Sequence, residues 1–173
     1  MRCGRLEDAR RVFDNLVKKS FRSWTIMIGG YAQHNHAEDA MELFNKMRQE
    51  DLHPDELAYL SILKACSKSS SLNWVKQVHA DIRHAGFESG LRVGTALVHM
   101  FGKCGSLDDA RLVFDRMEHR DVITWNVMIG GLAEHGCGQE AYELFMQMQR
   151  EGLEPDAFTF SSILNPCSSA GAL

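Results

Sequence analysis

The chain has 173 residues, of which 45% are hydrophobic, and its formal net charge at pH 7 is −4. This charge excludes binding to nucleic acid through bulk positive charge alone, although a protein with a negative net charge can still carry a basic strip that binds nucleic acid. No apolar run approaches the length of a membrane span, so we expect no membrane partner. The five cysteines are an odd number without C-x-x-C spacing, and they predict neither a disulfide framework nor a metal site or cofactor.

The apolar spacing predicts helices that come in pairs along the chain. The first members are expected at 24–31, 59–63, 96–101 and 125–132, and the second members at 40–47, 75–82, 110–117 and 141–148. Helix breaks fall between the pairs, at Pro54-Asp55, Gly90 and Pro155-Asp156. Gly86 and Gly152 have the position of the residue that ends a helix in a left-handed conformation.

The chain also contains an internal duplication. CGRLEDARRVF from Cys3 returns as CGSLDDARLVF from Cys104, and SWTIMIGGYAQH from Ser23 returns as TWNVMIGGLAEH from Thr124. All matching segments have the same offset of about 101 residues. Trp24 and Trp125 recur at core spacing, so we interpret both as packing residues.

Pairs of helices this short cannot bury their own apolar faces, and they must stack on their neighbours. The sequence therefore predicts an all-α fold, an α-solenoid of stacked helix-turn-helix repeats without a central globular core.

The tetratricopeptide pattern W-x-x-L-G-x-x-Y is absent, and Pro-Asp closes a unit instead. The sequence pattern resembles that of plant pentatricopeptide repeat (PPR) proteins of the PLS subclass. This subclass alternates P, L and S repeats and forms a right-handed superhelix. By this resemblance the chain divides into a partial S repeat (1–20), a P repeat (21–55), an L repeat (56–90), an S repeat (91–121), a second P repeat (122–156) and a partial L repeat (157–173). Because the last repeat stops within its opening helix, we expect the chain to be a fragment of a longer protein.

The resemblance implies that each repeat faces one base of single-stranded RNA, through its fifth and its last residue. The implied base-reading pairs are Thr25 with Asp55, Thr95 with Asp121, and Asn126 with Asp156. In the family the Thr–Asp pairing favours G and the Asn–Asp pairing favours U. The alternative is that the Thr and Asn side chains are merely solvated and that each Asp is an ordinary N-cap; the capping and reading roles of Asp can coexist.

Other positions depart from the family pattern. Leu60 with Gly90 is no readable pair, and Ser20 and Ser161 are half-pairs whose partners lie outside the chain. The expected readout is therefore 5′-G-n-G-U-3′. The second residue of a repeat stacks on the base in the family; Ile123 fits this role, whereas Arg22 and Arg92 would stack as guanidinium planes or meet phosphate.

The resemblance implies sequence-specific binding of single-stranded RNA that selects a site for C-to-U editing or other processing in a mitochondrion or chloroplast. Editing factors or a deaminase domain would be supplied elsewhere. The chain has His36-Ala37-Glu38 and Pro166-Cys167, but the second cysteine that the P-C-x-x-C signature of a zinc deaminase needs is missing, so we expect no enzyme activity. The competing hypothesis is a helical scaffold that binds a protein or peptide in its concave groove.

Overall fold

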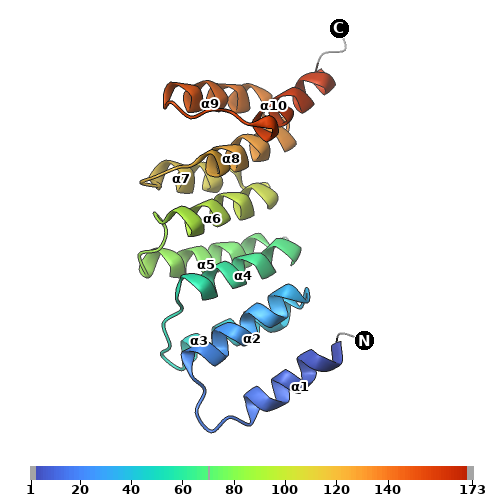
Figure 1. Ribbon diagram of the computed structural model, residues 1–173, viewed down its shortest axis with the longest axis vertical. Coiled ribbons are helices and arrows are strands. Elements are labelled where there is room, and N and C mark those ends of the chain that lie inside the picture. Colours follow the sequence, from blue (N-terminus) through green and yellow to red (C-terminus); the bar gives the residue numbers. More distant parts are fainter. Residues whose placement is uncertain (1–2, 70, 171–173) are drawn as a thin grey trace. The chain divides into compact units, whose positions relative to one another are not determined.

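The structure, a computed structural model, describes residues 3–69 and 71–170, without the side chains of residues 3–4, 68–69 and 165–170. Every regular element in this part of the chain is an α-helix (Figure 1). The chain forms two compact units, Met1–Trp74 and Val75–Leu173, which are described separately below. Within the described ranges, no helix combines the length and the apolar character that crossing a membrane requires.

The N-terminal unit contains α1 (Cys3–Asp14), α2 (Phe21–Gln33), α3 (Ala37–Gln49) and α4 (Glu56–Ser69). Helix α2 packs on α1, α3 and α4, and α3 also packs on α4. Helix α5 (Leu72–His84) begins in this unit and continues into the next one.

The C-terminal unit continues with α6 (Leu91–Lys103), α7 (Leu107–Arg116), α8 (Val122–Glu134), α9 (Gly138–Arg150) and α10 (Ala157–Ala170). Helix α8 lies between α6 and α10 and contacts both, while α7 packs on α6 and α8, and α9 on α8 and α10. We call α2, α4, α6, α8 and α10 the first helices, because each opens a predicted repeat. The prediction of an all-α chain of stacked helical pairs is confirmed.

An aromatic pair repeats where one predicted repeat meets the next. Phe13 meets Trp24 edge to face with 4.8 Å between ring centroids, and Phe114 meets Trp125 in the same way at 4.8 Å. Both tryptophans are buried, so their interpretation as packing residues is confirmed. Such pairs are stabilising beyond the area that they bury, by about 0.5–1.5 kcal/mol each.

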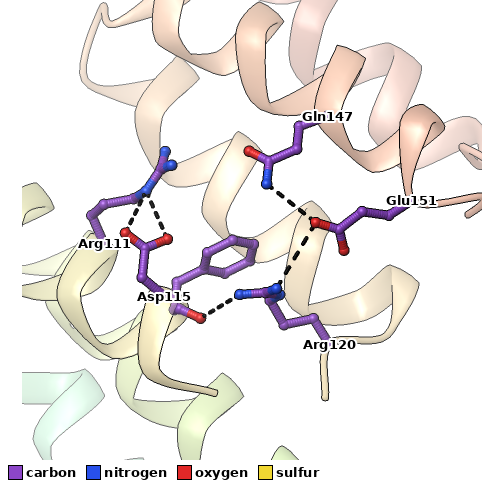
Figure 2. Close-up of polar contacts among 6 residues, drawn as sticks. Arg111, Asp115, Arg120, Gln147 and Glu151 are labelled. Carbon is purple, nitrogen blue, oxygen red and sulfur yellow. Dashed lines mark hydrogen bonds and ion pairs between the residues drawn. The ribbon is translucent and has the colours of Figure 1, made fainter. Parts of the chain in front are cut away.

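Arg120 covers the second of these pairs and closes the end of α7. Figure 2 shows its guanidinium group directed toward Glu151. Its Nη1 donates to the carbonyl oxygen of Phe114 (3.2 Å), which lies in the last turn, where carbonyls lack a helical partner four residues on. Its guanidinium carbon lies 5.1 Å from the Phe114 ring centroid and 5.7 Å from that of Trp125. Nη2 lies 3.9 Å from Glu151, which also accepts from Gln147. One cation thus links α7, α8 and the end of α9.

Equivalent helix ends of the duplicated copies have different residues at the left-handed position. After α9, Gly152 has φ +79°, the Gly152 N–H donates to the Gln149 carbonyl, and the Leu153 N–H donates to the Met148 carbonyl. This is the left-handed helix end predicted for Gly152. After α3 the same two hydrogen bonds form, but Asp51 holds the left-handed position at φ +55°. A side chain is strained in this conformation, whereas glycine is not.

Replacing Arg120 tests its role at the end of α7. We expect Arg120→Met to lower the free energy of unfolding by about 2 kcal/mol, because a helix-end carbonyl and two ring faces lose a charged partner. Arg111→Met is the matched control: Arg111 pairs with Asp115, one turn away on the same exposed helix face (Figure 2), so its loss should cost about 0.5 kcal/mol or less. Urea unfolding of both variants checks this, and equal losses would contradict it.

Exchanging the helix-end residues of the two copies tests the strain at Asp51. We expect Asp51→Gly to stabilise the N-terminal unit and Gly152→Asp to destabilise the C-terminal unit, by about 1 kcal/mol in each direction. Thermal unfolding of the two single variants measures the effect. Two shifts of the same sign would show that the left-handed conformation does not decide stability at these ends.

Candidate functional site

The predicted base-reading residues occupy equivalent places in the structure. Thr25, Thr95 and Asn126 are the fifth residues of α2, α6 and α8. Asp55, Asp121 and Asp156 directly precede α4, α8 and α10. Each predicted pair thus joins the fifth residue of one first helix to the start of the next.

All three aspartates cap the helix that follows them. Asp55 Oδ1 accepts from the N–H of Ala58 (2.8 Å), and Asp121 Oδ1 accepts from that of Thr124 (2.8 Å). Asp156 Oδ1 accepts from the N–H of Thr159 (2.9 Å). The N-cap interpretation is therefore confirmed. A carboxylate has two oxygens and about four acceptor positions, so capping through Oδ1 does not exhaust it.

Asn126 and Asp156 are in direct contact. Asn126 Nδ2 donates to Asp156 Oδ1 (2.9 Å), across the packed helices α8 and α10. Thr159 Oγ1 lies 2.5 Å from Asn126 Oδ1 and 2.9 Å from Asp156 Oδ1. Asn126 is only 5% exposed, so the alternative of a merely solvated side chain is wrong here, and little of the amide is open to a ligand.

Thr95 and Asp121 are joined through a third residue. Thr95 Oγ1 lies 2.7 Å from Thr124 Oγ1, and Thr124 Oγ1 donates to Asp121 Oδ1 (2.8 Å). Thr95 Oγ1 is also 2.6 Å from the Leu91 carbonyl oxygen of its own helix. The structure thus brings this pair into one chain of hydrogen bonds.

Thr25 and Asp55 are not joined in this way. Thr25 donates to the Phe21 carbonyl one turn earlier (3.3 Å), and Asp55 accepts from the backbone of Ala58. Alanine has no hydroxyl group with which to link the two. Thr25 is 6% exposed, so it too is not a merely solvated residue.

The weaker predicted positions have local roles. Ser20 caps α2 by accepting from the Ser23 N–H (3.2 Å), and Gly90 is the N-cap residue of α6. Ser161 is exposed on α10 and donates to the Phe158 carbonyl (2.9 Å). Leu60 is half-buried on α4 and belongs to a different unit from Gly90.

The predicted stacking residues are exposed second residues of first helices. Arg22 on α2 and Arg92 on α6 are exposed, and Ile123 on α8 is 64% exposed. Leu57 on α4 and Phe158 on α10 occupy the same register and are also exposed, but the sequence interpretation missed them. Counting two residues on from Asp55 and Asp156 would have found both.

The structure offers no support for a metal centre within the residues that it describes. In that part of the chain, no group of three or more His, Cys, Asp or Glu side chains could hold a metal ion. The side chains of Pro166 and Cys167, which match part of the zinc-deaminase signature, lie outside the described residues.

The hydrogen bonds at Asp156 lower the pKa of its carboxyl group below the ordinary value. The backbone N–H of Thr159 is the largest cause, and the side chains of Thr159 and Asn126 add to it against a smaller desolvation effect. Because folding lowers this pKa, ionised Asp156 stabilises the fold above the pKa of the unfolded chain, and this contribution is lost as the pH falls through the folded-state value.

Sequence patterns of known families match much of the chain. The pattern of the PPR repeat family matches residues 22–68 and 120–169, and the pattern of the single PPR repeat matches residues 95–122. Together these matches cover more than half of the chain.

Similar proteins come from plants. A pentatricopeptide repeat-containing protein of Arabidopsis thaliana is 43% identical over 170 residues, which are 98% of this chain and 23% of the relative. A mitochondrial member from the same plant is 38% identical over 172 residues, 99% of this chain and 27% of the relative. Other relatives are named chloroplastic. The chain thus spans about a quarter of the length of these relatives.

A solved structure has the same fold. The crystal structure of the pentatricopeptide repeat protein PPR10, in complex with an 18-nt psaJ RNA element, aligns with a TM-score of 0.78 at 21% identity. The alignment covers 98% of this chain and 26% of that one.

The lowered pKa of Asp156 provides a test of the contact with Asn126. We expect Asn126→Ala to raise this pKa toward the ordinary value, while the Thr159 N–H keeps part of the shift. NMR titration of the Asp156 carboxyl carbon measures the change. Asp109, whose pKa is lowered mainly by its hydrogen bond from Ser106, is the internal control and should not respond. An unchanged Asp156 pKa would contradict the contact.

Proposed function

This chain belongs to the pentatricopeptide repeat family, and on that premise we propose that it binds single-stranded RNA and reads one base with each repeat. The observation that carries the proposal is the contact between Asn126 and Asp156, with its counterpart from Thr95 to Asp121. Each is a polar cluster that joins the fifth residue of one repeat to the last residue of the same repeat. A helical scaffold for peptides has no evident need for polar pairs in this one register.

The bases follow from the pairing preferences that the resemblance to the family implies. We assign G to Thr25 with Asp55, G to Thr95 with Asp121, and U to Asn126 with Asp156, and we leave the base at the L repeat unspecified. The resulting site is 5′-G-n-G-U-3′, with the repeat boundaries and the PLS subclass given above. Ile123, Leu57 and Phe158 are exposed at the register that would flank the bases, which supports a stacking role.

The biological setting follows from the relatives. Since relatives of this chain are named mitochondrial or chloroplastic, the proposed setting is organellar RNA. The repeats would select the site of C-to-U editing or another processing step, and editing factors or a deaminase domain elsewhere would perform the chemistry.

Three readable repeats limit the affinity of this chain. A good polar base contact discriminates by about 1–3 kcal/mol, so three contacts offer roughly 3–9 kcal/mol before the cost of ordering the RNA. Micromolar binding needs about 8 kcal/mol net. Binding by the 173 residues is therefore expected to be weak, and NMR titration suits it because it detects weak complexes.

A base swap at Asn126 tests the proposal. The chain and its Asn126→Thr variant are titrated with 5′-GAGU-3′ and 5′-GAGG-3′ in the same flanking adenosines. We expect the preference to move from U to G, because the threonine introduced beside Thr159 would repeat the arrangement of Thr95 beside Thr124.

The third nucleotide, which we assign to Thr95, is the control. The preference of the protein for G at this position should not change in the Asn126→Thr variant. If the preference at the fourth nucleotide does not move, the assignment of Asn126 and Asp156 is wrong. If neither protein discriminates between the RNAs, the RNA-reading function itself is contradicted for this chain.

A further inference from the structure

Thr159 lies at the centre of the Asn126–Asp156 contact, although it belongs to the next repeat. It is the third residue of α10, and none of its surface is exposed. Its Oγ1 accepts from the backbone N–H of Asp156 (3.0 Å) and lies within hydrogen-bonding distance of both Asn126 Oδ1 and Asp156 Oδ1. A hydroxyl has one proton, so it donates fully to only one of these two oxygens.

The surrounding groups fix the direction of the Asn126 amide. An ionised carboxylate can only accept, so Asn126 must turn its Nδ2 toward Asp156, as the 2.9 Å contact shows. The amide oxygen then faces Thr159, whose proton goes to this nearer oxygen at 2.5 Å rather than to Asp156 at 2.9 Å. Nδ2 carries two protons, so one N–H of the amide takes part in neither of these contacts.

Thr124, the third residue of α8, has the equivalent position relative to Thr95 and is also fully buried. The proton of Thr95 goes either to Thr124 Oγ1 (2.7 Å) or to the Leu91 carbonyl (2.6 Å). Both acceptors belong to the protein, so Thr95 is left with lone pairs to offer a ligand. The two networks therefore leave different groups for a ligand: Asn126 keeps a spare N–H donor beside its amide oxygen, whereas Thr95 offers only hydroxyl lone pairs.

This difference in polarity matches the Watson–Crick edges of the assigned bases. Uracil offers the O4 acceptor to a spare amide N–H, and guanine offers the N1–H and N2–H donors to hydroxyl lone pairs. We propose that Thr159 and Thr124 are specificity-determining positioning residues, which fix the hydrogen-bonding polarity of the reading residue in the preceding repeat. The inference rests on the proposed RNA-reading function and adds a residue from the next repeat to each reading pair.

The test removes each hydroxyl separately. Thr159→Val keeps the shape of the side chain and the backbone N–H that Asp156 caps, and Thr159→Ser keeps the hydroxyl. The 173-residue chain and both variants are titrated by NMR with 5′-GAGU-3′ and 5′-GAGG-3′ in flanking adenosines, and the ratio of the two dissociation constants is compared. A ratio cancels any uniform loss of affinity that a small change in folding causes.

We expect the unsubstituted chain to prefer U by about fivefold or more, Thr159→Val to bring the ratio within about twofold of unity, and Thr159→Ser to restore the preference. Thr124→Val is the matched control, because Thr124 has the same position relative to Thr95 as Thr159 has relative to Asn126. It should reduce discrimination at the third nucleotide, measured with 5′-GAUU-3′ against 5′-GAGU-3′, and leave the fourth unchanged. Thr159→Val should do the reverse.

The outcomes separate the inference from the function on which it rests. If the unsubstituted chain prefers U and Thr159→Val keeps that preference, the positioning role is overturned and the proposed function stands. The same holds if valine and serine at position 159 lose the preference equally, because the hydroxyl is then not the cause. An unsubstituted chain without preference overturns the proposed function and the positioning role with it.

Discussion

The side-by-side packing of neighbouring first helices is the constraint on which the rest of this structure depends. In the C-terminal unit α8 contacts both α6 and α10, and a Cβ added to Gly131 would lie 3.7 Å from the Cα of Gly102. The hydrogen bonds between Thr95 and Thr124 and between Thr159 and Asn126 form only because the helices approach this closely. The polar contacts of a repeat therefore depend on the repeat that follows it, and a repeat removed from its neighbour would lose both its apolar packing and the geometry of its polar pair.

The position of each aspartate follows from a local rule rather than from a ligand. A helix start leaves backbone N–H groups without partners, and an aspartate just before it satisfies one of them. Asp55, Asp121 and Asp156 do this in the same way, so each carboxylate is held in one place before any ligand arrives. Pre-organisation of this kind reduces the ordering cost of binding. Capping is thus compatible with the ligand contact that we propose for the same side chains.

Much of the fold could be predicted from the sequence, because helix periodicity, helix-end glycines and an internal duplication all act within short segments. The helices, the buried Trp24 and Trp125, and the left-handed Gly152 were found in this way. The roles of Thr124 and Thr159 were not, because their hydrogen bonds join residues about 30 positions apart and depend on how one helix packs on the next. Arg120 was missed for the same reason: its partners lie on α7, α8 and the end of α9.

Two of the positions at which the duplicated copies differ are in contact with each other in the second copy. Thr25 and Ala58 in the first copy correspond to Asn126 and Thr159 in the second. A buried threonine can donate its single hydroxyl proton to a carbonyl oxygen of its own helix, as Thr25 does to that of Phe21. Thr25 therefore needs no hydroxyl group at position 58, where the first copy has alanine. An asparagine in the same place also brings an amide oxygen, and leaving a buried acceptor without a partner costs about 1–3 kcal/mol. Thr159 supplies that partner. The change from Thr25 to Asn126 and the change from Ala58 to Thr159 are therefore physically coupled, and Asn126 without Thr159 would be the less stable combination.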